Sequence, residues 1–167
     1  VISGASTRSF ADTGRWSMIS VPARSLPADS LKASGFLKHW DESISKRPFY
    51  NYYRSESEIT ALECGRAYWR KGSKPVSIRL SPDSVITADT SIVLTHESQG
   101  YGWNQIGSPF AYPVVWSDSS LDLWQWDEQN QDYTKAGGVL QPWKGYWVQT
   151  EENRTVSVSA TPAFSTA

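Results

Sequence analysis

An internal duplication constrains this chain more than any other feature of its sequence. Three blocks recur in the same order, namely Trp16–Pro22 with Trp103–Pro109, Leu37–Glu42 with Leu123–Glu128, and Leu62–Trp69 with Leu140–Trp147. The offset is 87 positions between Trp16 and Trp103 but 78 between Trp69 and Trp147, so the first copy holds extra residues, which fall within 43–61. Because a solenoid needs about three repeats or more, two copies predict one pseudo-symmetric domain.

Apolar residues inside and beside the blocks alternate with a period of two, which is typical of strands. Strand patterns cover Trp16–Val21, Val76–Leu80, Ile92–Thr95, Leu121–Trp126, Tyr146–Thr150 and Val156–Ser159. Polar, turn-forming residues separate them at short intervals, and Trp126–Tyr133 has the pattern of a hairpin. We therefore predict an all-β sandwich or barrel built from two duplicated halves.

Helical patterns are few. Asp29 or Ser30 is placed to cap a helix over 31–40, although Gly35 weakens that interpretation, and Ser55–Glu58 matches a capping box. We expect at most two short helices. The predicted organisation is a single domain over 1–167, with a first repeat at about 16–80, a linker over 81–101, a second repeat at about 102–160 and a frayed tail over 161–167.

Composition excludes several classes of protein. A single cysteine among 167 residues cannot form an internal disulfide, and a formal net charge of −1 argues against nucleic acid as a partner. The chain has no apolar run long enough for a membrane helix and no signal-peptide pattern at its start, so we expect no membrane insertion and interpret the chain as an excised domain or mature fragment.

The motif order of the second copy points to a known module. Trp103-Asn104-x-Ile106-Gly107-x-Pro109 is followed by Leu123-Trp124-x-Trp126 and by Lys144-Gly145-Tyr146-Trp147-Val148. This order resembles a module that recurs in large secreted and cell-surface proteins of bacteria and archaea. The first copy departs from it at Glu63–Gly65 and at Ala67. The resemblance implies an accessory β domain of an extracellular or cell-surface protein, without catalytic residues.

Possible catalytic and metal-binding groups lack supporting patterns. The acidic pairs Asp41-Glu42 and Asp127-Glu128 fall in predicted turns, where carboxylates are ordinarily solvated. Cys64 has no nucleophile signature around it, and neither His39 nor His96 belongs to a zinc motif. Residues 127–132 are rich in oxygen ligands but lack the glycine and final glutamate of a calcium loop. We predict no enzyme activity, no metal site and no cofactor.

The duplication divides the aromatic residues into two groups. Six tryptophans form matched pairs, which we assign to the structural core: Trp16 with Trp103, Trp40 with Trp126, and Trp69 with Trp147. Aromatic residues that the shared fold does not require are freer to bind a ligand. These candidates are the unmatched tryptophans and a tyrosine cluster in the insertion, namely Trp116, Trp124, Trp143, Tyr50, Tyr52 and Tyr53.

Two classes of function stay open. The first is a non-catalytic structural, adhesive or protein-docking module of an extracellular bacterial protein, whose partners are other domains of the parent protein or a surface protein. The second is a carbohydrate-binding module that stacks a polysaccharide on exposed tryptophan and tyrosine rings.

Overall fold

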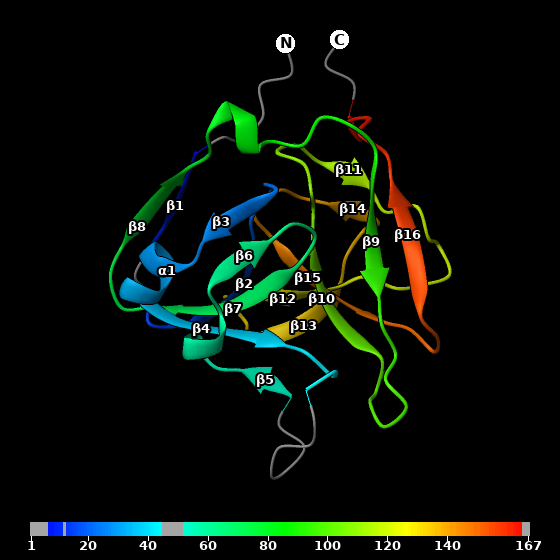
Figure 1. Ribbon diagram of the computed structural model, residues 1–167, viewed down its shortest axis with the longest axis horizontal. Helices are drawn as coiled ribbons and strands as arrows, with labels where there is room; N and C mark the ends of the chain where they lie inside the picture. The colour runs from blue at the N-terminus through cyan, green and yellow to red at the C-terminus, as the bar shows by residue number, and fades with distance from the viewer. Residues whose placement is uncertain (1–6, 12, 45–51, 165–167) are drawn as a thin grey trace.

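The computed structural model describes residues 7–11, 13–44 and 52–164, and their regular structure consists almost wholly of short antiparallel strands (Figure 1). The first half contains β1 (Thr7–Phe10), β2 (Trp16–Ser20), β3 (Ser25–Pro27), β4 (Gly35–Trp40), β5 (Tyr53–Arg54), β6 (Ala61–Glu63), β7 (Ala67–Gly72) and β8 (Val76–Arg79). The second half contains β9 (Thr90–Leu94), β10 (Trp103–Gly107), β11 (Val114–Val115), β12 (Trp124–Asp127), β13 (Asp132–Lys135), β14 (Val139–Leu140), β15 (Gly145–Gln149) and β16 (Arg154–Val158). The predicted all-β fold is confirmed as sandwich-like, and the sheets of the described residues do not close into a barrel.

The two halves share one topology. A four-stranded sheet runs β2-β7-β4-β5 in the first half and β10-β15-β12-β13 in the second. The flanking pairs β1–β8 and β3–β6 likewise match β9–β16 and β11–β14, and the outer pairs β1–β8 and β9–β16 lie at opposite sides of the molecule (Figure 1). The registers also agree, because Met18 pairs with Trp69 where Gln105 pairs with Trp147. The duplication in the sequence is therefore a duplication of structure.

Segments outside the matched blocks also join the sheets. Strand β9 lies in the predicted linker and pairs with β16, as β1 pairs with β8, so each half begins one strand earlier than its first block. In the predicted tail, the Ala163 N–H donates to the Pro113 carbonyl at 2.8 Å and Pro162 bridges to Val114. The tail is thus paired rather than frayed at these residues, and 165–167 lie outside the described residues.

The helical predictions had different outcomes. Helix α1 (Asp29–Ala33) forms, but the expectation of a helix continuing to Trp40 is wrong, because Gly35–Trp40 is strand β4. A β-carbon at Gly35 would lie 2.3 Å from the Lys71 carbonyl oxygen, so this strand needs glycine for its close approach to β7. The capping-box prediction is confirmed by the 3₁₀ turn η2 (Glu56–Glu58), where the Glu58 carboxylate accepts from the Ser55 N–H at 2.7 Å. A second 3₁₀ turn, η3, spans Pro82–Ser84.

Each half has its own apolar core. Leu31, Leu37, Leu62, Tyr68 and Ile78 belong to the core of the first half. The core of the second half includes Leu94, Ile106, Phe110, Leu140 and Tyr146. A third, aromatic cluster lies between the halves and contains Met18, Ala67, Trp69 and Trp147, with further tryptophans packed around them. Burial of apolar surface therefore stabilises the halves separately and also joins them.

Backbone contacts join the halves symmetrically. The Ser20 N–H donates to the Trp143 carbonyl at 3.0 Å, and the Gly107 N–H donates to the Gly65 carbonyl at 3.1 Å. Ser20 and Gly107 occupy equivalent positions, and so do Gly65 and Trp143. A β-carbon at Gly107 would lie 2.1 Å from the Ser20 Cβ, so only one of the two facing positions can carry a side chain.

Trp143 holds the two halves together. Its φ of +68° places it in the left-handed region, where the first half has Gly65 with a φ of +77°. The indole enters the core of the first half, where it is 4% exposed and its centroid lies 6.2 Å from that of Phe10. Burial of this large side chain offsets the cost of the backbone conformation.

Replacement of Gly107 by alanine should destabilise the protein by about 1–3 kcal/mol, because the new methyl overlaps Ser20. Chemical denaturation measures the loss. Gly137→Ala is the matched control, since a β-carbon there meets no atom within 4 Å. Ser20→Gly should cost less stability in the Gly107→Ala background than in the wild type, because it also removes the overlap there, and equal costs would contradict the facing arrangement.

Stability should fall between pH ~7 and ~5 because of His39. Burial lowers the pKa of His39 from 6.5, the Ala67 carbonyl opposes this effect, and Arg66 reinforces it. The unfolded chain therefore binds a proton at a pH where the folded chain does not, so protonation favours unfolding as pH drops. In denaturant titrations at several pH values, His39→Gln should flatten the slope in this window, and an unchanged slope would exclude His39 as its cause.

Candidate ligand-binding groove

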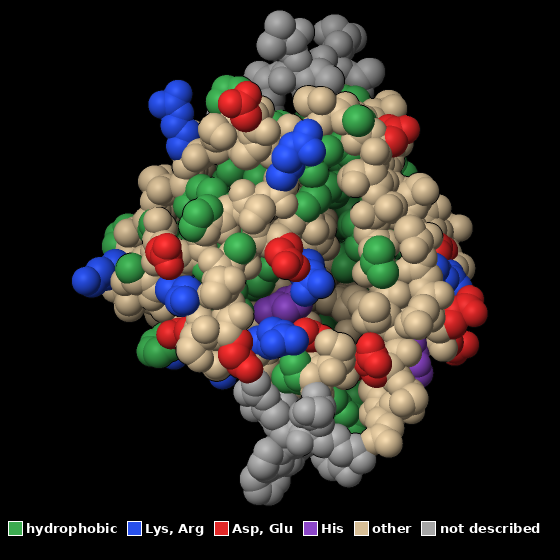
Figure 2. All heavy atoms as spheres, viewed as in Figure 1, with side chains coloured by type: hydrophobic (Ala, Val, Ile, Leu, Met, Phe, Trp, Pro, Cys, Tyr) green, Lys and Arg blue, Asp and Glu red, His purple; other side chains and the backbone are tan. Residues whose placement is uncertain are grey.

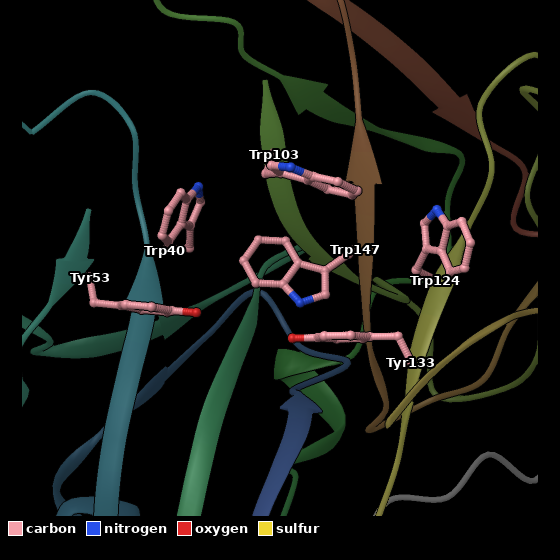
Figure 3. Close-up of a pocket in the computed structure, with 6 residues that line it drawn as sticks. All are labelled: Trp40, Tyr53, Trp103, Trp124, Tyr133 and Trp147. Carbon is pink, nitrogen blue, oxygen red and sulfur yellow. The ribbon is translucent and has the colours of Figure 1, made fainter. Parts of the chain in front are cut away.

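An aromatic recess of about 400 Å³ opens between the two four-stranded sheets. We call it the aromatic cage, and its lining consists of Trp40, Tyr53, Trp103, Trp124, Tyr133 and Trp147 (Figure 3). Strands β4 and β5 supply Trp40 and Tyr53, and strands of the second half supply the rest. The cage therefore exists only because the halves dock together.

The rings that line the recess stand nearly perpendicular to their neighbours, so they form walls and a floor and not a flat platform. Trp147 is 7% exposed, and the centroids of Trp40 and Trp103 lie 5.9 and 6.0 Å from its own, each at an interplanar angle of 79°. Tyr53 lies 5.0 Å from Trp40 at 75°. Edge-to-face packing of this kind is favourable between aromatic rings, so the walls support one another.

Tyr53 and Tyr133 are equivalent residues, and in Figure 3 their hydroxyls point toward each other. Burial raises the pKa of both phenols, whereas interaction with Trp69 lowers that of Tyr53 and interaction with Trp147 lowers that of Tyr133. The Trp147 indole nitrogen is buried, and none of the described residues accepts a well-aligned hydrogen bond from it. Both phenols keep their protons at neutral pH.

A buried carboxylate supports two walls of the cage from behind. Glu42 accepts hydrogen bonds from the Trp40 indole at 3.2 Å and from the Trp103 N–H at 3.3 Å. It also accepts from the N–H groups of Tyr101 and Gly102, at 3.0 and 2.7 Å. Its counterpart in the second half, Glu128, has an exposed side chain. Glu42 thus joins the end of the first block to the start of β10.

The residues predicted from the sequence to bind a ligand fall into two groups in the structure, those that line the cage and those that are buried. Trp124 and Tyr53 line the cage. Trp116, Trp143 and Tyr52 are 6%, 4% and 4% exposed, so these three predicted site residues are unavailable to a ligand. Tyr50 lies outside the described residues.

The six matched tryptophans were all predicted to lie in the core, but only two of them do. Only Trp69 and Trp147 are buried. Trp40 and Trp103 are partly exposed walls of the cage, and Trp16 and Trp126 are partly exposed around a second recess. Sequence reasoning missed Trp40, Trp103 and Tyr133 as site residues. The sequence pattern that could have identified them is the placing of aromatic residues at alternate strand positions, on one sheet face, in both halves.

Groups considered for catalysis have structural partners instead. Asp41 pairs with Arg54 at 2.6 Å; burial raises the pKa of Asp41, but hydrogen bonds from Ser43 and Arg54 outweigh this effect and lower it. Burial raises the pKa of the Cys64 thiol, and among the described residues neither histidine hydrogen-bonds to it. The Asp127 carboxylate accepts from Gln129 and Asn130 within its own turn.

Further features of the described residues bear on partners. Among them, no three histidine, cysteine, aspartate or glutamate residues form a group that could hold a metal ion. Figure 2 shows positive and negative side chains interspersed over one face, without a broad patch of one sign. None of the described helices is long and apolar enough to cross a membrane.

Comparisons with family models, with curated proteins and with solved structures found no match to this chain.

Glu42→Ala should destabilise the protein by about 3 kcal/mol or more, because a buried N–H left without an acceptor costs about 1–3 kcal/mol and Glu42 serves several. Chemical denaturation measures the change. The matched control is Glu128→Ala at the equivalent exposed position, which should shift stability by less than about 0.5 kcal/mol. Equal effects would contradict the structural role of Glu42.

Proposed function

We propose that this protein is a non-catalytic binding module of an extracellular or cell-surface bacterial protein, and that its aromatic cage receives a compact group projecting from the partner. The single observation that carries the proposal is the cage itself, in which six aromatic side chains from both halves surround an open recess. Tryptophan and tyrosine are the residues that most often dominate binding interfaces, because each offers a large, rigid contact area.

The shape of the cage favours a compact guest. Its walls stand at 75–79° to their neighbours, so a convex group entering it would contact several ring faces at once. The resemblance to accessory modules of secreted proteins agrees with a docking or adhesive role, and the partner would be a surface protein or another domain of the parent chain.

Carbohydrate binding is the second candidate. The observation that favours it is that Trp103 and Trp124 are partly exposed, and that the Lys135 ammonium, which can donate to a sugar hydroxyl, lies 5.4 Å from the Trp124 ring centroid. An extended polysaccharide would stack best on coplanar rings, whereas Trp40 and Trp103 each stand at 79° to Trp147, and Tyr53 stands at 75° to Trp40. Docking of a compact group therefore ranks first.

A panel of cell-wall polysaccharides, surface proteins and small amphiphilic compounds, screened by calorimetry, tests the proposal. Any ligand that binds should lose at least about tenfold in affinity in both Trp103→Ala and Trp124→Ala, since each variant removes a wall worth more than about 1.4 kcal/mol. Phe164→Ala removes an exposed aromatic outside the cage and should leave binding unchanged. Binding that survives both tryptophan variants would place the site elsewhere.

A further inference from the structure

The cage has a pseudo-equivalent recess, which is also lined by residues of both halves. This second recess has a volume of about 280 Å³ and is lined by Trp16, Lys38, Tyr53, Trp69, Trp126 and Tyr133. Matching of the strand registers makes Trp16 the counterpart of Trp103, Trp69 of Trp147, and Trp126 of Trp40. The two tyrosines line both recesses, so the aromatic walls are nearly the same twice.

The two recesses differ at one lining position. Lys38 pairs with Trp69 on β7, and Trp124 pairs with Trp147 on β15, so Lys38 and Trp124 are counterparts. The Lys38 ammonium lies 5.5 Å from the centroid of the Trp16 ring, within the range of a cation–π interaction. The second recess therefore carries a cation from its own chain. In the cage, tryptophan replaces that lysine, and no lysine or arginine of the described residues lies over the Trp103 ring.

The two recesses also differ in a carboxylate, which is buried beside the cage and exposed at the equivalent position of the other half. Glu42 is 7% exposed and contacts both Trp40 and Trp103, whereas Glu128 at the second recess is exposed. Within the described part of the chain, Glu42 forms no ion pair with a lysine, arginine or histidine. A buried negative charge is screened less than an exposed one, so it favours a cation beside the walls that it contacts.

The cation beside one wall of the cage is ion-paired. Lys135 lies 5.4 Å from the Trp124 ring centroid, but its ammonium pairs with the Asp122 carboxylate at 2.9 Å. The cage thus combines aromatic faces with a buried carboxylate that is hydrogen-bonded but, among the described residues, not ion-paired, and it lacks the lysine that lines the second recess.

We propose that the aromatic cage binds a quaternary ammonium group such as trimethylammonium. Such a cation has no N–H to satisfy and sheds water readily, so it suits a recess walled by rings, whereas a primary amine would need acceptors. This inference rests on the proposed function, because it names the chemistry of the group that enters the cage.

Calorimetric titration with tetramethylammonium and with choline tests the proposal, and 3,3-dimethylbutan-1-ol is the neutral control of the same shape as choline. Both cations should bind at least about tenfold more tightly than the alcohol, the ratio expected for a desolvated cation–π site. Equal affinity for choline and the alcohol would overturn the proposal, because shape alone would then explain binding. A titration with phosphatidylcholine vesicles separates a lipid headgroup from free choline as the source of the group.

Three variants locate the site and its charge. Trp124→Lys should abolish choline binding, because it removes one wall and places an ammonium beside Trp103, as Lys38 lies beside Trp16, and Phe164→Ala should not change it. Glu42→Gln should weaken choline at least about threefold and leave the alcohol unchanged, provided that its circular dichroism matches the wild type. If Trp124→Lys bound choline as the wild type does, the assignment of the quaternary ammonium site to the cage would be wrong, regardless of the result for Glu42→Gln.

The outcomes separate this inference from the proposed function. If neither cation binds while another ligand binds in a manner that Trp103→Ala abolishes, the quaternary ammonium assignment is wrong and the binding module stands. If neither these cations nor any member of the wider panel binds, both proposals fail.

Discussion

Close backbone approach at the pseudo-twofold axis is the constraint on which the rest of the structure depends. A β-carbon at Gly107 would lie 2.1 Å from the Ser20 Cβ, and one at Gly145 would lie 2.7 Å from the Ala67 Cβ. In each pair the facing residues are counterparts, and one of them is glycine. A strictly repeated sequence could not satisfy both contacts with side chains on each half. At most one counterpart of each pair can carry a side chain at this distance, and the two copies differ at both positions.

Docking at this distance produces both the aromatic cluster and the opening beside it. Strands β7 and β15 bring Trp69 and Trp147 toward the axis, and the neighbouring strands carry the aromatics that surround them. Sequence differences away from the axis then make the two recesses unequal. Lys38 occupies the position equivalent to Trp124, and buried Glu42 the position equivalent to exposed Glu128. Duplication thus supplies the walls, while the differences between copies give one recess its own chemistry.

Much of the fold was predictable because it depends on local patterns that recur. The strands, the hairpin at Trp126–Tyr133 and the two related halves follow from period-two alternation and repeated motifs. The helix predicted beyond Ala33 was wrong because apolar spacing in so short a segment also fits strand β4, whose contact with β7 decides the outcome. Pairing of β9 with β16 depends on contacts distant in sequence, which no local pattern encodes.

The site was harder to predict, because a tryptophan that recurs in both copies is not necessarily buried. Trp40 and Trp103 recur in both copies yet remain partly exposed, because the cleft between the halves stops short of closing over them. Trp143 has no partner in the first copy yet is buried, because it crosses into the other half's core. Relaxation of indole ring protons by a neutral gadolinium chelate in solution tests this division most directly. The account predicts strong relaxation for Trp40, Trp103 and Trp124 and protection of Trp116 and Trp143, and uniform or reversed relaxation would contradict it.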